Sequence, residues 1–70
     1  MKLTVNGEEK VFKETKEKLN LLKVIEHLGH NPKLIVVEFN GEILSPILWT
    51  NQTVHEGDNI EIVTIVGGGS

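Results

Sequence analysis

Cysteine is absent from the sequence, which excludes disulfide bonds and thiolate metal sites. A chain of 70 residues is long enough for one domain, and a domain this small buries only a modest share of its surface. Without a covalent staple, the core must come from the 39% of residues that are hydrophobic. The absence of cysteine also fits a reducing compartment, so we expect a cytoplasmic protein.

Arginine is absent as well, and ten acidic residues outweigh seven lysines to give a net charge of −3. The lysines are interleaved with glutamates, which is typical of a solvated surface rather than a nucleic-acid-binding face. Long hydrophobic runs are missing too. Leu34–Val37 is far too short to span a bilayer, and the Asn6-Gly7 turn signal interrupts the N-terminal segment before a signal peptide could form. We expect neither nucleic acid nor a membrane as a partner.

The residues that usually carry catalysis or bind metals are few and scattered. His27 and His30 have a spacing that could share a metal on one helix, but Gly29 and Pro32 predict that the helix ends before His30. The third histidine is remote in sequence, and a single aspartate is available to complete a ligand shell. We therefore expect no metal site and no active site within this chain.

The first 13 residues predict a β-hairpin. Leu3 and Val5 alternate with polar residues, as in a half-buried strand. Asn6-Gly7 is the strongest short hairpin signal, because both residues of such a turn adopt positive φ. Glu9–Lys13 is predicted as the returning strand.

A helix of about ten residues is expected next. Asn20 is a good N-cap, and Leu19 before it could pack against Val24 as a hydrophobic staple. Gly29 stands where a left-handed C-cap belongs. The apolar residues with helical spacing are Leu21, Leu22, Val24, Ile25 and Leu28.

The second half of the chain predicts three further strands. Lys33–Phe39 contains a β-branched run typical of a strand buried on both faces, and Asn40-Gly41 turns it back into Glu42–Leu44. Pro46 favours an irregular crossing, in which Trp49 is expected to cover one end of the core. After the turn at Glu56–Asp58, Ile60–Val66 is predicted as the last strand.

The last predicted strand is apolar on both faces near its end, which favours a central strand or one whose outer face meets a partner. The order strand, strand, helix, strand, short strand, strand predicts an α+β fold. We expect a ubiquitin-like β-grasp, a mixed sheet of four to five strands with one helix packed on one face. Residues 1–66 form this domain, and residues 67–70 form a glycine-rich tail.

The tail Gly67–Gly69 is not a phosphate-binding loop, because such loops precede a helix and only Ser70 follows here. Three interpretations remain open. The segment could be an appended cloning linker, a frayed terminus, or an extended tail that threads a narrow channel in another enzyme. Glycine suits the third, because a backbone without side chains can approach closely.

The sequence resembles the ThiS family of sulfur carriers of the thiamine pathway. The resemblance covers nearly the whole chain and is most specific in its second half, at Val37–Ile43, Trp49, Glu56–Val63 and Val66–Gly69. The resemblance implies a carrier rather than an enzyme. Its C-terminal glycine carboxylate is adenylated and then converted to a thiocarboxylate, which donates sulfur for thiazole formation.

The resemblance also implies the partners. They are an adenylyltransferase of the ubiquitin-activating (ThiF) type, which uses ATP and magnesium, and thiazole synthase (ThiG type); the carrier itself binds no cofactor. The implied acceptor is Gly69, with Gly68 required beside it and Gly67 in the tail. Members of the family generally end on glycine, so Ser70 is either trimmed, added in cloning, or a departure from the pathway.

Ile65 and Val66 are the hypothetical docking residues for these partners, against the alternative that they pack in the core. Three other functions stay open. A molybdopterin-synthase-type small sulfur carrier has the same fold and tail chemistry, although the Pro-containing segment usual before its glycines is missing here. A β-grasp binding module without sulfur chemistry would tolerate loss of the tail. A small enzyme lacks a plausible catalytic constellation.

Overall fold

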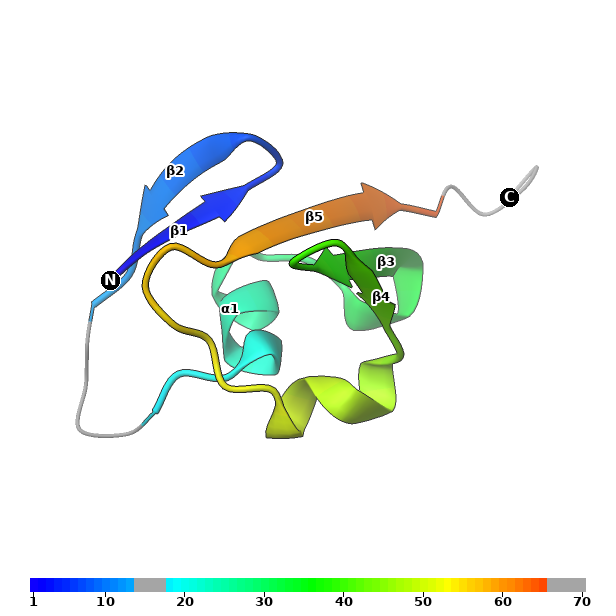
Figure 1. Cartoon of the computed structure of the whole chain (residues 1–70). Helices are drawn as coiled ribbons and strands as arrows, with labels where there is room; N and C mark the ends of the chain where they lie inside the picture. The colour runs from blue at the N-terminus through cyan, green and yellow to red at the C-terminus, as the bar shows by residue number, and fades with distance from the viewer. Residues whose placement is uncertain (14–17, 66–70) are drawn as a thin grey trace.

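The computed structural model of the chain describes residues 1–13 and 18–65 (Figure 1). One mixed sheet with strand order β2-β1-β5-β3-β4 packs against helix α1. This α+β arrangement confirms the predicted fold class and element order. The elements are β1 (Lys2–Val5), β2 (Glu8–Val11), α1 (Leu21–His27), η1 (Pro32–Leu34), β3 (Ile35–Phe39), β4 (Glu42–Leu44), η2 (Pro46–Asn51) and β5 (Asn59–Thr64), where η1 and η2 are 3₁₀ helices.

Strand β5 lies in the middle of the sheet, as its hydrophobic sequence predicted. It runs parallel to β1, with the pairs Thr4↔Asn59 and Val5↔Ile60. It runs antiparallel to β3 over five pairs, from Phe39↔Ile60 to Ile35↔Thr64. The first and last strands of the chain are therefore neighbours, and the C-terminal segment leaves directly from the centre of the sheet.

Both Asn-Gly turns form where the sequence predicted them. Asn6 and Gly7 have φ values of 51° and 81°, and Asn40 and Gly41 have 50° and 87°. Two successive residues with positive φ are the signature of the type I′ turn, whose twist matches the flanking strands. The returning strand β2 is Glu8–Val11, so the prediction placed both its ends too late along the chain.

Helix α1 has seven residues and is shorter than predicted. Its start is as expected, because Asn20 Oδ1 accepts a hydrogen bond of 2.8 Å from the Lys23 N–H. At the other end Gly29 has φ 82°, its N–H donates to the Glu26 carbonyl, and the His30 N–H donates to the Ile25 carbonyl. These two bonds form a Schellman motif that closes the helix after His27. The predicted length had included the capping residues.

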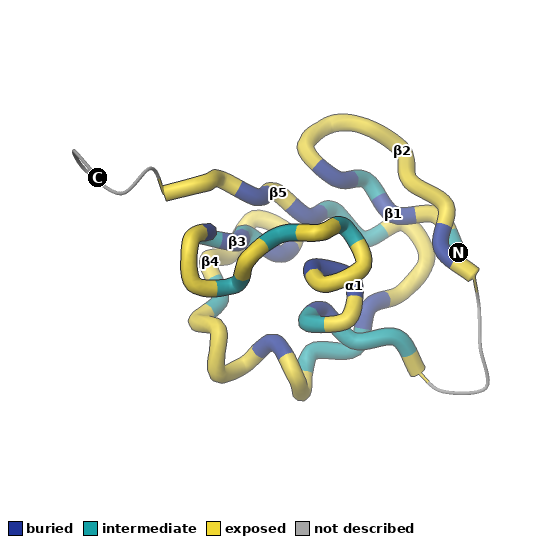
Figure 2. Tube along the Cα trace, turned by 180° about the vertical axis from the view of Figure 1, so that it is seen from behind, coloured by how far each residue is buried: buried dark blue, intermediate teal, exposed yellow. Residues whose placement is uncertain are grey.

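The core lies between α1, η2 and one face of the sheet, and buried positions alternate along β1, β3 and β5 (Figure 2). Trp49 is 1% exposed, and its Nε1–H donates to the Leu44 carbonyl at 3.0 Å, which confirms its predicted place in the core. The most deeply buried members beside it are Leu3, Leu21, Val24, Ile25, Val37, Val54 and Ile60.

The prediction that the Leu34–Val37 run is buried on both faces is wrong. Leu34 belongs to η1 and is 48% exposed, and in β3 the buried Ile35 and Val37 flank a half-buried Val36. The reason is that α1 and η2 cover only one face of the sheet. Among the described residues, no helix is long and apolar enough to cross a membrane.

Candidate functional site

The predicted tail residues Val66, Gly67, Gly68 and Gly69 lie outside the described residues, as does Ser70. The structure instead defines the tail root, by which we mean Val63–Ile65, the last described segment before the glycines. The position of this root depends on β5, and β5 is held by strands from both hairpins. The tail root therefore continues directly from the central strand of the sheet.

The tail root is bonded to its neighbours as far as Ile65. The β3–β5 ladder continues to the Ile35↔Thr64 pair, and the Ile65 N–H donates to the Leu34 carbonyl at 2.6 Å. Figure 1 shows β5 running towards the C-terminal end of the molecule, away from the N-terminus.

The outer face of β3, β4 and β5 is hydrophobic close to the tail root. We call this surface the open face; its members in these strands are Val36, Glu38, Ile43, Glu61 and Val63, joined by Ile65. Val63 is 61% exposed, Ile43 69% and Ile65 49%. The proposed docking residue Ile65 is therefore accessible and not a core residue, although its docking role stays a prediction.

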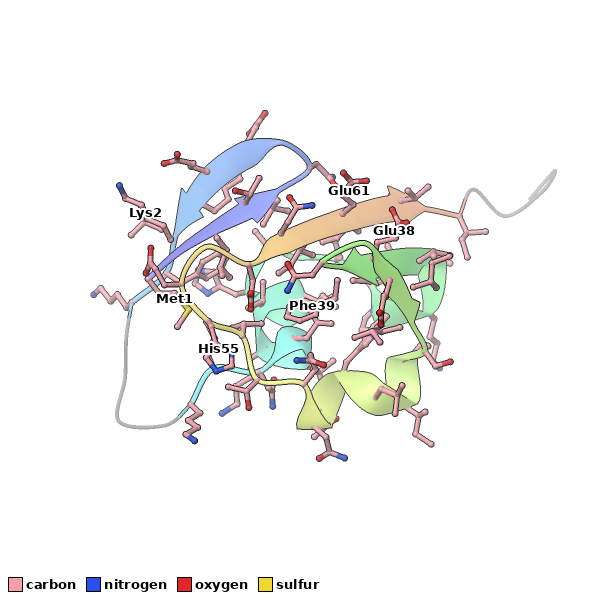
Figure 3. All side chains as sticks on the ribbon, in the orientation of Figure 1. Met1, Lys2, Glu38, Phe39, His55 and Glu61 are labelled. Carbon is pink, nitrogen blue, oxygen red and sulfur yellow. The ribbon has the colours of Figure 1, made fainter. Side chains whose placement is uncertain are left out.

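Two carboxylates lie in the middle of the open face. Glu38 and Glu61 are directly paired across β3 and β5, and Figure 3 shows both side chains on the side of the sheet away from α1. Like charges in opposite positions of a ladder repel each other and destabilise the sheet. A partner that brings a lysine or arginine against this pair would remove the repulsion.

No catalytic constellation is visible among the described residues. His27 ends α1 and packs its ring on Phe12 with centroids 5.4 Å apart, while His30 follows the Gly29 cap, so the two do not share a helix. His55 lies 3.9 Å from Asp58. Within residues 1–13 and 18–65, no three metal-ligating side chains are grouped together.

A groove of about 590 Å³ lies at the end of the sheet opposite the tail root, and the sequence analysis did not predict it. Apolar and basic side chains form the part of its walls that the structure describes. Its lining residues are Val11, Phe12, Lys13, Leu19, Lys23 and His27. No carboxylate is among these described lining residues, so they offer no pairing of a carboxylate with a basic group for catalysis.

Asn6 has a second role that sequence reasoning missed. The turn signal accounted for its backbone, but its carboxamide also bonds to the backbone of Ile62. The two residues are 56 positions apart, so no local pattern could have indicated the contact. It ties the first hairpin to the strand that carries the tail root.

Solved structures of similar proteins share this fold. A crystal structure of the thiamine biosynthesis protein ThiS from Geobacter metallireducens superposes with a TM-score of 0.82 at 34% identity, covering 99% of this chain and 100% of that one. An NMR solution structure of a thiamine biosynthesis protein from the same organism gives 0.80 at 34% identity, covering 100% and 90%. These neighbours confirm the β-grasp fold.

Curated relatives are of two kinds. A thiazole synthase of Paramagnetospirillum magneticum is 36% identical over 70 residues, and this chain spans 21% of its length. An uncharacterised protein, ycf40, of Trieres chinensis is 37% identical over 65 residues, which cover 93% of this chain and 85% of that protein.

The ThiS family model matches residues 3–69, which include all three tail glycines and stop before Ser70. The match therefore extends over both hairpins, the helix, the open face and the tail. With the shared fold and about one-third identity to the solved structures, these findings agree with the resemblance seen in the sequence. The chain belongs to the ThiS family.

Proposed function

We propose that this chain is a sulfur carrier for thiazole formation in thiamine biosynthesis, and that it acts as a substrate rather than as a catalyst. The observation that carries the proposal is the family match, which runs through the domain and ends at Gly69. The lack of a catalytic constellation among the described residues is compatible with this role, because a carrier relies on the catalytic groups of its partners.

The proposed chemistry takes place at the carboxylate of Gly69. A carboxylate is a poor electrophile, so its oxygen first attacks the α-phosphorus of ATP, forming an acyl adenylate and releasing pyrophosphate. A sulfide nucleophile then attacks the acyl carbon, and the bond to AMP breaks. The products are a thiocarboxylate, AMP and a proton, with no change in the oxidation state of carbon.

The glycines suit this chemistry because each lacks a side chain. Gly67 and Gly68 would let the backbone enter a channel too narrow for larger residues, and Gly69 would present the reacting carboxylate at its end. Where Ser70 follows Gly69, the carboxyl group of Gly69 is part of a peptide bond and cannot be adenylated. The proposal therefore requires a form of the protein that ends at Gly69.

The first proposed partner is an adenylyltransferase of the ubiquitin-activating type, which supplies the ATP and magnesium site. Ile65 and Val66 would dock against it next to the channel entrance. The exposure of Ile65 and Val63 supports this, because an apolar patch beside the tail root would be buried on binding. The carboxylates of Glu38 and Glu61 favour a partner surface that is basic at this point.

The second proposed partner is thiazole synthase, the acceptor of the sulfur. The relative named thiazole synthase contains a segment similar to all 70 residues of this chain within a protein about five times as long. Linking two partners in one polypeptide raises their effective concentration, so such an arrangement is expected of proteins that act on each other. The relative therefore supports this partner for the separate chain.

Intact-mass measurement tests the proposal. The protein ending at Ser70 and a form ending at Gly69 are incubated with the organism's adenylyltransferase, ATP, magnesium and a sulfur donor. We expect the Gly69 form to gain the mass of one sulfur in place of one oxygen. A form ending at Gly67 is the matched control and should stay unchanged.

Two results decide the outcome. Sulfur gain by the Gly69 form alone supports Gly69 as the acceptor and requires removal of Ser70. If no form reacts while an established carrier does so with the same enzyme, the sulfur-carrier proposal is wrong and a β-grasp binding module remains.

A further inference from the structure

The two turn asparagines hold β5 from opposite edges. Asn6 and Asn40 each begin an Asn-Gly turn with φ near 50°, and each directs its carboxamide to the strand between the two hairpins. Asn6 bonds to β5 from the β1 side and Asn40 from the β3 side. The two contacts lie at different positions along β5. We therefore expect them to differ in how strongly they affect the direction of the tail.

Asn6 extends the parallel ladder between β1 and β5 beyond the end of β1. Its backbone N–H donates to the Ile60 carbonyl at 2.9 Å. Its Oδ1 accepts from the Ile62 N–H at 2.7 Å, and its Nδ2 donates to the Ile62 carbonyl at 3.2 Å. One carboxamide thus satisfies both backbone groups of Ile62, as one more strand residue would.

Beyond Ile62 the described part of β5 pairs with a neighbouring strand on one side only. Val63 and Thr64 pair with β3, and the Ile65 N–H bonds to Leu34. On the β1 side, the strand pairs end at Ile60. The contact from Asn6 to Ile62 is therefore the last one on that side, among the described residues, before the tail root. When β5 is hydrogen-bonded on both sides up to Ile62, the direction in which the chain leaves the sheet is better defined than when it is bonded on both sides only up to Ile60.

We propose that Asn6 is a positioning residue for the tail chemistry, because its carboxamide orients the tail root through Ile62. The proposal rests on the sulfur-carrier function above. A tail that must enter a narrow channel loses less conformational freedom on binding when its root is already oriented. Asn6 should therefore affect productive docking of the tail more than it affects the stability of the fold.

Asn40 supplies a matched control. Its Oδ1 accepts from the Asn59 N–H at 2.8 Å, and its Nδ2 donates to Asp58 Oδ1 at 3.1 Å. It makes the same number of side-chain bonds from the same kind of turn, but at the start of β5, far along the strand from Ile65. Glycine is the appropriate replacement at both positions, because it adopts positive φ without strain.

The test compares Asn6→Gly, Asn40→Gly and the unsubstituted chain, each ending at Gly69, as substrates of the adenylyltransferase. We expect Asn6→Gly to lower kcat/KM for adenylation by about threefold to tenfold, whereas Asn40→Gly leaves it within about twofold. Asn6→Asp keeps the acceptor for the Ile62 N–H but loses the donor, so it should give an intermediate value. Urea unfolding confirms that each variant is folded under the assay conditions.

Hydrogen exchange provides a readout that does not depend on the enzyme. The Ile65 N–H bonds to Leu34 and not to Asn6, so faster exchange at Ile65 in Asn6→Gly, absent in Asn40→Gly, would show that the effect reaches the tail root. Equal kcat/KM values for the two glycine variants, or unchanged Ile65 exchange in Asn6→Gly, would overturn the proposal. If the unsubstituted chain is not adenylated, the proposed function is wrong, and the exchange measurement still decides whether Asn6 orders the root.

Discussion

At the scale of single residues, the same residue type serves different purposes at different depths of the fold. Ile62 is 6% exposed and anchors β5 in the core, while Ile65, three residues later, is 49% exposed. Because successive residues of a strand point to opposite faces, the sequence places Ile62 and Ile65 on different faces, but it does not show which face α1 covers. Their different exposure separates a residue needed for folding from one available to a partner.

Replacement of Ile65 by aspartate tests this separation. Because the side chain is already half exposed, Ile65→Asp should change the free energy of unfolding by less than about 1 kcal/mol. It should lower kcat/KM for adenylation by about tenfold, because a charge replaces an apolar contact at the docking surface. Val11→Asp is the control, since Val11 is 74% exposed at the far end of the sheet. Global unfolding of Ile65→Asp would show instead that the residue stabilises the core.

At the scale of elements, the pairing of β3 with β5 places two residues of like charge opposite each other, which lowers the stability of the sheet. Glu38 and Glu61 are directly opposite, and one position further along the same face the hydrophobic pair Val36↔Val63 leads to the tail root. The sheet would be more stable without the facing carboxylates. Their presence in the middle of the proposed docking surface is consistent with a role in selecting a basic partner.

Glu61→Gln should therefore increase the free energy of unfolding by about 0.2 to 1 kcal/mol at neutral pH and low salt. The gain should shrink as salt is added, because screening weakens repulsion between exposed charges. Urea unfolding at low and high salt measures both effects. Glu9→Gln is the control, because Glu9 faces Thr4 across β1 and β2 and has no carboxylate opposite. A loss of stability in Glu61→Gln would mean that Glu61 makes a favourable interaction that outweighs the repulsion.

At the scale of the whole molecule, stability and the proposed function are carried by separate parts of the chain. The buried hydrophobic residues extend from Leu3 to Ile62, and the expected chemistry belongs to Gly67–Gly69. The parallel pairing of β1 with β5 links the two parts, because it places the last strand in the centre of the sheet. The tail root thus departs from one of the most constrained strands of the fold.

Deletion of residues 67–70 should leave the thermal midpoint unchanged within about 2 °C, because the described core ends before this segment. The same deletion should abolish adenylation and sulfur transfer completely. Calorimetry and the intact-mass assay provide the two measurements on one sample. A large drop in the thermal midpoint would show that the tail contributes to the packed fold and is not solely a reactive segment.

Features that depend on neighbouring residues could be predicted from the sequence. The two Asn-Gly turns, the Asn20 cap and the Gly29 cap follow from backbone preferences that act within a few positions, and all four were confirmed. The apolar character of the last strand also predicted its central place, although β5 buries residues on one face only.

Features that depend on distant parts of the chain could be seen only in the folded structure. Whether Val36 and Val63 are covered depends on which face of the sheet receives α1, and their own sequence does not specify this. The facing of Glu38 with Glu61 requires the β3–β5 register, and the bond from Asn6 to Ile62 joins residues 56 positions apart. Local backbone preferences act between residues a few positions apart, whereas these contacts form only when the last strand lies between the two hairpins.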